Sequence, residues 1–445
     1  MTMKLWEKGK KTDRLVEEFT SGQDRQLDLM LAPWDVLGTI AHVRMLEKSG
    51  LLSLSELVNL EKELKAIYAR AVSGEFTIDE GVEDVHSQVE ILLTAALGET
   101  GKKVHAARSR NDQVLVDLKL FTRARLKEIS EQMVVLFNTL LRLSNRYKDV
   151  MMPGYTHMQV AMPSSFGLWF GAWAECLVDD MILIEAAYRV ADQNPLGSAA
   201  GFGSSFPVDR EMTTSLLGFG NMHVNSVNAQ MSRGRMEKTV AFALGTVGST
   251  LSRMAGEICL YSGQNYRFME LPEEFTTGSS IMPHKKNPDI FELVRARGNR
   301  LQSVQAEISI ICTNLPSGYH RDYQLIKETY LPAFGQLADI LSVTNKVVDQ
   351  IRVNPDILND PIYRDLYSVE EVNRLVIGGM PFRDAYRTVA DNLSEGASAP
   401  ADMIRHTHIG STGNPCNEMI QKKMERIMAG FDFTAAEKAI AGLLE

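Results

Sequence analysis

Apolar residues recur three or four positions apart over most of the chain, which is the spacing of the buried face of an α-helix. The clearest stretch covers 112–149, where leucine, isoleucine, methionine and phenylalanine keep this spacing over most of its length. Similar stretches cover 164–192, 235–262, 288–314 and 329–352. A helix of about 30 residues is about 45 Å long, which is too long for a small compact domain. These stretches therefore predict an extended helical bundle.

Breaks in this pattern predict three helical domains. Shorter helical patterns fill 1–105, the long stretches fill 106–360, and shorter patterns broken by glycine pairs fill 361–445. Proline after Asn354 and after Asp360 marks the second boundary. Alternating strand patterns are scarce, so the predicted fold class is all-α. Apolar faces left over on such long helices favour an oligomer in which the central bundles form a multi-helix core.

Composition and charge narrow the function classes. The net charge is −9 and no basic stripe is interleaved with aromatic residues, so a nucleic-acid partner is not expected. No run of 18 apolar residues occurs, which argues against a membrane span. Residues 1–8 lack the apolar core of a signal peptide. The four cysteines form no Cys-x-x-Cys pair, and three lie in apolar stretches, which suits buried thiols in a reducing compartment. We therefore expect a cytoplasmic protein.

The segment 276–288, Thr-Thr-Gly-Ser-Ser-Ile-Met-Pro-His-Lys-Lys-Asn-Pro, carries the strongest indication of chemistry. Its glycine, serine and proline content predicts a loop, and Asn287 is expected to cap a helix that begins at Pro288. A loop that leads into a helix N-terminus offers free backbone N–H groups to an anion, and Lys285 adds a positive charge. The alternative interpretation is a mobile surface loop with a solvated basic cluster.

This segment also carries a family resemblance. The motif Gly-Ser-Ser-x-Met-Pro-x-Lys-x-Asn-Pro at 278–288 resembles the signature of the fumarase/aspartase superfamily. Within that superfamily, Arg-Ser-Arg-Asn-Asp-Gln at 108–113 resembles the hallmark of the argininosuccinate lyases, which include the delta-crystallins as relatives. The family pattern also matches segments 153–159, 319–327 and 406–414. The resemblance therefore covers nearly the whole chain. It implies a carbon–nitrogen lyase of arginine biosynthesis that converts argininosuccinate into arginine and fumarate by anti elimination.

Such an elimination needs a base for a weakly acidic proton, positive charge near the developing carbanion, and help for the departing nitrogen. By resemblance, Ser279 is the base, with its alkoxide stabilised by loop amides and Lys285. His157, expected just before a helix, would donate a proton to the leaving nitrogen or orient a group that does. Glu292 would pair with His157. Which of Ser279 and His157 is the base stays open, and the plainer interpretations are a turn serine and a structural histidine.

The same resemblance assigns residues to substrate binding. Arg110 offers a planar fork of donors for a carboxylate, and Asn111 offers an amide. For Arg108, a salt bridge at the start of a helix is an equally open interpretation. The other expected substrate contacts are Thr156, Gln159, Asn287, Tyr319, Gln324 and Lys327. Segment 19–25 departs from the family pattern, so no substrate contact is assigned there.

No cofactor and no metal site is predicted. The glycine-rich segment 98–103 fails as a phosphate loop because Lys103 stands where serine or threonine is needed. His406 and His408 lack acidic or cysteine companions in their segment, which argues against a metal site.

The resemblance also implies a homotetramer in which motifs from three subunits meet at each site. Two alternatives remain: a related lyase that acts on another N-linked succinate, such as an adenylosuccinate-type substrate, and a catalytically silent structural relative. The stretch 109–113 argues against the first. The presence of Ser279, His157, Lys285 and Glu292 argues against the second.

Overall fold

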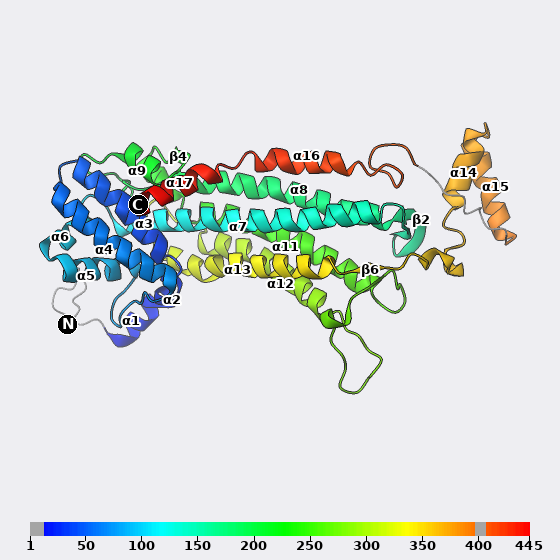
Figure 1. Ribbon diagram of the computed structural model, residues 1–445, viewed down its shortest axis with the longest axis horizontal. Helices are drawn as coiled ribbons and strands as arrows, with labels where there is room; N and C mark the ends of the chain where they lie inside the picture. The colour runs from blue at the N-terminus through cyan, green and yellow to red at the C-terminus, as the bar shows by residue number, and fades with distance from the viewer. Residues whose placement is uncertain (1–12, 397–405) are drawn as a thin grey trace.

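The computed structural model describes residues 13–396 and 406–445. These residues form an elongated, largely helical molecule, with a cluster of shorter helices at one end of a long bundle and a helical hairpin at the other (Figure 1). The all-α fold class is therefore confirmed. The expectation about residues 1–8 concerns a segment outside the described residues.

Five long helices form the bundle. They are α7 (Arg110–Arg146), α8 (Phe166–Ala191), α11 (Arg235–Tyr261), α12 (Asp289–Ile311) and α13 (Tyr323–Val348). Each corresponds to one of the five predicted stretches. The largest difference is at α13, which starts at Tyr323 rather than at residue 329. The helix runs through Pro332, a residue type usually confined to the first turn because it lacks an amide hydrogen.

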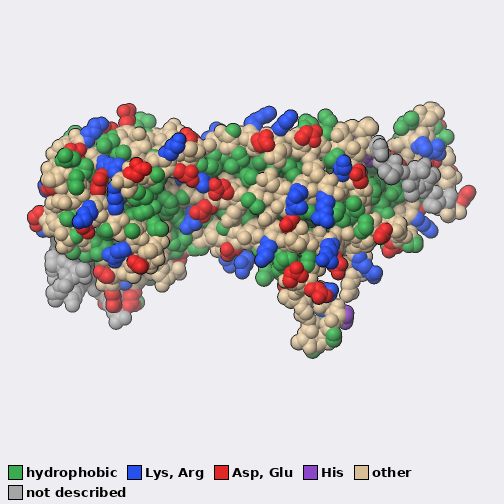
Figure 2. All heavy atoms as spheres, viewed as in Figure 1, with side chains coloured by type: hydrophobic (Ala, Val, Ile, Leu, Met, Phe, Trp, Pro, Cys, Tyr) green, Lys and Arg blue, Asp and Glu red, His purple; other side chains and the backbone are tan. Residues whose placement is uncertain are grey.

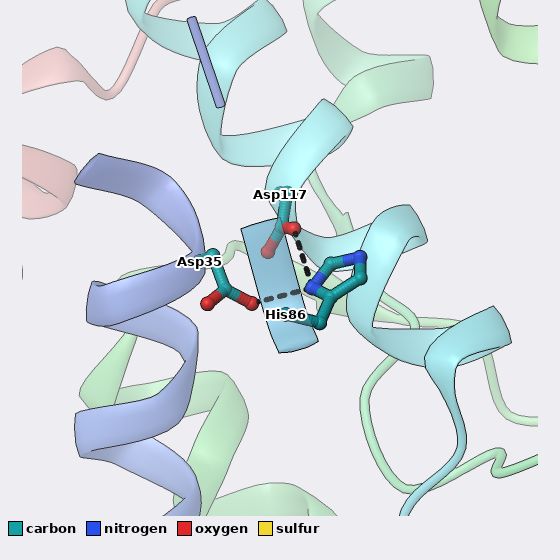
Figure 3. Close-up of side chains that lie close together, drawn as sticks. All are labelled: Asp35, His86 and Asp117. Carbon is teal, nitrogen blue, oxygen red and sulfur yellow. Dashed lines mark hydrogen bonds and ion pairs between the residues drawn. The ribbon is translucent and has the colours of Figure 1, made fainter. Parts of the chain in front are cut away.

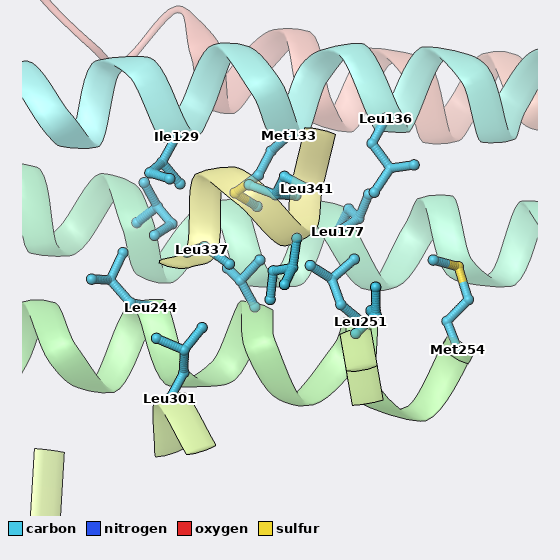
Figure 4. Packing of buried hydrophobic residues seen from close by; sticks show 14 of the residues in the cluster. Ile129, Met133, Leu136, Leu177, Leu244, Leu251, Met254, Leu301, Leu337 and Leu341 are labelled. Carbon is cyan, nitrogen blue, oxygen red and sulfur yellow. The ribbon is translucent and has the colours of Figure 1, made fainter. Parts of the chain in front are cut away.

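The apolar faces of these helices meet in one central core, which Figure 4 shows in part. Its buried residues include Ile129, Met133, Leu136, Leu177, Leu244, Leu251, Met254, Leu301, Leu337 and Leu341. Helices α11 and α12 approach each other closely at two glycines. A Cβ added at Gly298 would lie 2.3 Å from the carbonyl oxygen of Gly248, so the two backbones touch there.

The helical cluster at the N-terminal end has a second core. Its helices are α1 (Arg14–Ser21), α2 (Asp24–Asp28), α3 (Ala32–Lys48), α4 (Leu54–Ser73), α5 (Val85–Leu97), α6 (Glu99–Lys102), η1 (Lys103–His105), α9 (Arg210–Leu216) and α10 (Ser226–Met231). The last helix of the chain, α17 (Phe433–Leu444), returns to this end and contributes the fully buried Leu443. This end of the molecule therefore combines segments that are far apart in the sequence.

The chain after α13 spreads over the whole length of the molecule. The short helices η3 (Ile357–Asn359) and η4 (Pro361–Tyr363) lead into the hairpin of α14 (Ser368–Ile377) and α15 (Phe382–Ser394). This hairpin has its own small core of Val372, Ala385 and Val389. Helix α16 (Asn417–Met428) then runs back along α8 and α7 (Figure 1).

Three small two-stranded sheets lie between the helices. They pair β1 (Met151–Thr156) with β2 (Gln159–Ser165), β3 (Gln193–Asn194) with β4 (Asn221–Met222), and β5 (Met269–Glu270) with β6 (Arg352–Val353). The short helix η2 (Glu273–Phe275) follows β5. The β1–β2 hairpin is antiparallel and follows the C-terminal end of α7. It was not expected from the sequence.

The surface carries both charge signs. Figure 2 shows basic and acidic side chains interspersed over the face in view. Within residues 13–396 and 406–445, no helix combines the length and apolar character needed to cross a membrane. The cysteines are free thiols, with Cys176 exposed and Cys259, Cys312 and Cys416 partly exposed. The expected burial of these thiols is therefore wrong for the single chain.

Candidate active site

The residues expected at the site lie in three places in one chain. One group lines a pocket where the helical cluster meets the bundle, which we call the junction pocket. A second group is at the tip of the β1–β2 hairpin. The third lies in and just behind the loop 278–286, which projects from the side of the bundle (Figure 1).

The junction pocket has a volume of about 180 Å³. Five of the expected substrate contacts line it together, although they come from two distant parts of the sequence: Arg110, Asn111, Tyr319, Gln324 and Lys327. The start of α7 supplies the first two, and the start of α13 and the segment before it supply the others. The sequence did not predict that these two motifs meet in one chain.

Capping of α7 fixes the first two of these residues. The Ser109 side chain accepts a hydrogen bond from the Asn111 amide, and the Asp112 carboxylate accepts one from the Ser109 amide at 2.9 Å. Asp112 also accepts from the amides of Gly197 and Ala199, at 3.0 and 2.8 Å. Burial raises the pKa of Asp112 to about 6, although these hydrogen bonds act to lower it. The cap therefore anchors the first turn of α7 to the segment that follows β3.

Acidic residues hold the cations of the junction pocket. The Arg110 guanidinium lies 3.2 Å from the Asp84 carboxylate. The buried Lys327 ammonium lies 2.7 Å from both Asp24 and Asp28. Burial alone would lower the pKa of Lys327, but these two carboxylates raise it. Burial raises the pKa of Asp24 to about 6, and Lys327 only partly offsets this. Alternating charges of this kind suit a zwitterionic amino-acid group.

Backbone carbonyl groups complete one wall of the junction pocket. The Gln324 amide nitrogen donates to the carbonyl oxygens of Thr20 and Ser21, at 2.8 and 3.2 Å. Arg321 donates to the Thr20 carbonyl and to Glu83, both at 3.0 Å. The start of α13 thereby holds the end of α1 in place, and the divergent segment 19–25 lies directly beside the pocket.

The hairpin tip presents Thr156, His157 and Gln159 at the surface. Thr156 pairs with Gln159, so His157 and Met158 are the two residues of the turn. Both have positive φ, 52° and 60°, as a type I′ turn requires. His157 is therefore at a hairpin tip rather than directly before a helix, because β2 separates it from α8. A non-glycine residue in this left-handed region is strained, which is typical of functional sites.

The projecting loop is closed by a short antiparallel bridge between Thr277 and Asn287. The Asn287 amide donates to the Thr277 carbonyl at 2.8 Å, and the Thr277 amide donates back at 3.2 Å. Helix α12 begins at Asp289 with Pro288 before it, so the expected helix cap at Asn287 is wrong. The backbone of Asn287 belongs to the bridge, and its side-chain amide lies 3.4 Å from the Gly278 carbonyl.

Within this loop the Ser279 hydroxyl oxygen accepts hydrogen bonds from two backbone amides. The donors are Met282 at 3.1 Å and Ile281 at 3.4 Å. Lys285 is exposed, and its ammonium forms no ion pair with the described residues. Glu292, one turn into α12, lies 4.0 Å from Arg295 of the same helix. The expected pairing of Glu292 with His157 stays a prediction.

The three places are far apart in one chain. Arg110 begins α7 and the hairpin follows its end, so 37 helical residues, about 55 Å, separate them. The loop and the junction pocket lie at opposite ends of α12, which has 23 residues and is about 35 Å long. A substrate the size of a dipeptide cannot reach both places in a single chain.

One group of side chains has the spacing of a metal site. Ligand atoms of Asp35, His86 and Asp117 lie within 4.8 Å of one another and are buried (Figure 3). His86 Nδ1 is 2.7 Å from Asp35 and 3.6 Å from Asp117. Burial alone would lower the pKa of His86, but the two carboxylates raise it to about 9. The partly buried Arg108 interacts with both carboxylates, and burial raises the pKa of Asp117 well above its ordinary value, so the group needs no metal ion to offset its acidic charge.

Sequence reasoning missed much of the junction pocket. It did not single out Asp24, Asp28, Glu83, Asp84 or His86, nor the two buried acids beside His86, Asp35 and Asp117. The sequence could have indicated Asp35 and Asp117, because each is an acidic residue in an otherwise apolar stretch of a helix, α3 or α7.

The salt bridge considered for Arg108 at the start of a helix is not a surface ion pair. Arg108 donates to the Thr39 hydroxyl at 3.0 Å and lies beside buried carboxylates.

Known proteins similar to this chain are lyases. The model of a family described as lyase matches residues 7–302. An argininosuccinate lyase of Phocaeicola vulgatus is 56% identical, and the alignment covers 100% of each chain. Another, from Thermotoga neapolitana, is 40% identical over 88% of this chain and 98% of its own. Among solved structures, an EDDS lyase in complex with formate has a TM-score of 0.77 at 21% identity, covering 98% and 94% of the two chains. A fumarate lyase, delta crystallin, from Brucella melitensis has a TM-score of 0.72 at 17% identity, covering 94% of this chain and 91% of its own.

Proposed function

The chain belongs to the argininosuccinate lyase family, and from this premise we propose that it converts argininosuccinate into arginine and fumarate as a step of arginine biosynthesis in the cytoplasm. The elimination breaks the bond between a guanidino nitrogen and the succinyl carbon. The electron pair of the adjacent C–H bond forms the double bond of fumarate, and the proton goes to the base.

We assign Ser279 as that base. The supporting observation is the pair of amides that donate to its oxygen, from Ile281 and Met282. Amides aimed at an oxygen favour its anionic form, which a serine needs to remove a proton from carbon. Lys285 adds positive charge in the same loop. His157 would then protonate the departing nitrogen, and Glu292 would orient His157.

We further propose that each site combines several subunits of a homotetramer. The helix lengths support this, because they keep the junction pocket about 55 Å from the hairpin and about 35 Å from the loop in one chain. Neighbouring bundles packed side by side in opposite directions would bring the three places together. Thr156, Gln159 and Asn287 would then contact substrate bound at the junction pocket of another subunit.

The direct test of the base is Ser279→Ala, followed by fumarate absorbance with argininosuccinate. We expect loss of turnover by at least about 1,000-fold, because the nucleophilic or basic group of a constellation usually contributes that much. Ser303→Ala, an exposed serine on α12, is the matched control and should keep parental turnover. Turnover of Ser279→Ala near the parent rate contradicts the assignment. Adenylosuccinate in the same assay separates the two substrate classes.

Mixing two inactive variants tests the shared site. Ser279→Ala and His157→Asn are unfolded together and refolded as mixed oligomers. If one site takes these residues from different subunits, some mixed sites contain both native side chains and activity returns. If both residues came from one subunit, no mixture could restore activity.

A further inference from the structure

We propose that His86 binds a carboxylate of the substrate in the junction pocket through Nε2–H, and that Asp35 and Asp117 are positioning residues that keep the ring charged. The proposal rests on the proposed function and adds a substrate-binding residue to it. It starts from the direction of the histidine ring. Nδ1 faces the two carboxylates, whereas Nε2 lies on the opposite side of the ring (Figure 3), and the side chain lines the junction pocket.

The other cations of the pocket already have acidic partners. Arg110 pairs with Asp84 and Glu83, Arg321 with Glu83, Lys327 with Asp24 and Asp28, and Arg233 with Glu237, all within 3.5 Å. In the described part of the chain, by contrast, the hydrogen bond and ion pairs of His86 all involve Nδ1, and none involves Nε2. It is therefore a donor that a ligand can engage without breaking an ion pair.

The protonation state decides whether Nε2 can donate. A neutral ring that gives its Nδ1 proton to Asp35 would leave Nε2 as an acceptor, which repels a carboxylate. An imidazolium donates from both nitrogens. The Asp35 and Asp117 carboxylates raise the pKa of His86 to about 9, so the ring is charged at neutral pH.

Charged groups on every neighbouring element favour or oppose the positive charge of the His86 ring. Asp35 comes from α3, Asp117 from α7 and Asp84 from the start of α5, and all three favour the charged ring. Arg108 and Arg110 near the start of α7 and Lys327 of α13 oppose it, while Asp28 of α2 offsets Lys327. His105 of η1 is uncharged at neutral pH, because burial lowers its pKa to about 4. Both carboxylates of the positioning pair retain buried oxygens without a hydrogen-bond partner. Burial and the neighbouring Asp35 charge raise the pKa of Asp117 well above its ordinary value, so Asp35, whose carboxylate lies 2.7 Å from Nδ1, contributes most to the charge on His86.

The test uses His86→Gln in the full-length enzyme, because glutamine keeps a neutral donor but removes the charge. We expect KM for argininosuccinate to rise about 10- to 100-fold, as a lost charge-assisted hydrogen bond implies, with a smaller change in kcat. Inhibition by at least one product, fumarate or arginine, should weaken by a similar factor. His42→Gln is the matched control: His42 is a buried histidine on α3 that donates to the Ala106 carbonyl and does not line the pocket.

The pH profile separates binding from a structural role. In the parent, 1/KM should fall as pH rises towards 9, and this basic limb should be absent in His86→Gln. Asp35→Asn leaves the ring in place but removes the main charge that raises the pKa of His86, so it should move this basic limb to lower pH. Unchanged KM and unchanged product inhibition in a folded His86→Gln overturn the proposal, and so does an unmoved limb in Asp35→Asn. If the parent itself released no fumarate, the proposed function would fail instead.

Discussion

Replacement of Lys327 by methionine should be among the most destabilising single changes at the junction pocket. The Lys327 ammonium is buried and lies 2.7 Å from two carboxylates, those of Asp24 and Asp28. Methionine fills a similar volume, so the main effect is to leave two acidic groups without their cation. Removing one partner of a buried ion pair typically costs about 3–5 kcal/mol.

Proton uptake sets the pH dependence of this loss. Burial raises the pKa of Asp24 to about 6 even with Lys327 present, and loss of the cation would raise it further. An acid whose pKa is raised in the folded state is stabilising below its unfolded pKa and loses that contribution as pH rises through the folded value. The variant should therefore be closer to the parent at pH 5 than at pH 8.

The assay is urea unfolding followed by far-ultraviolet circular dichroism, at one protein concentration because the protein is proposed to be oligomeric. The control is Lys286→Met, which removes an exposed ion pair with Glu273 and should leave the urea midpoint nearly unchanged, because solvent screens such a pair. Adding Asp28→Asn to Lys327→Met should recover part of the loss. A loss below about 1 kcal/mol at pH 8, or one equal to that of Lys286→Met, refutes the reasoning.

Three further outcomes follow from the packing and charges. Gly298→Ala should lower the thermal midpoint and reduce the free energy of unfolding by at least about 1–3 kcal/mol, because its methyl group would lie 2.3 Å from the Gly248 carbonyl oxygen. In the control Gly442→Ala, on α17, the added methyl group meets nothing within 4 Å and should not lower the midpoint. The stabilisation from charged His86 should be complete below pH 6.5 and lost as pH rises through about 9, by up to about 3 kcal/mol, and urea midpoints of His86→Gln should lack this fall. Asp112→Ala should cost about 2–4 kcal/mol in urea unfolding, because three amides lose their acceptor. Asp209→Ala removes a single cap from the partly exposed start of α9 and should cost about 1 kcal/mol.

The long helices could be predicted from the sequence because one apolar face repeats along each of them. α11 begins at the predicted residue, and α7 and α8 begin within two residues of their predicted starts. The β1–β2 hairpin could not be found in this way. Its turn residues, His157 and Met158, are not the asparagine and glycine that usually mark a type I′ turn. The cap at Asn287 failed because its backbone pairs across the neck of the loop, which local preferences do not reveal.

At the candidate site, too, the sequence predicted the local motifs but not how they meet in space. Each motif was visible as a run of unusual residues, but the meeting of α7 and α13 depends on packing between segments some 200 residues apart. The partners of Lys327 lie in α2, almost 300 residues earlier in the chain. Charge pairing over such separations leaves no periodic trace in the sequence, so the acidic half of the junction pocket was missed.

The long bundle separates recognition from chemistry. The junction pocket lies about 35 Å from the loop that holds Ser279, and no described ion pair or hydrogen bond joins the two within one chain. We therefore expect substitutions in the pocket to alter which amino-linked group is bound, while the proposed mechanism assigns proton abstraction from the succinyl half to the loop. Since a dianionic succinyl group is common to argininosuccinate and to adenylosuccinate, the loop cannot distinguish between them. Selection must come from the alternating acids and cations of the junction pocket, whose charges match an amino-acid group and not a nucleotide phosphate.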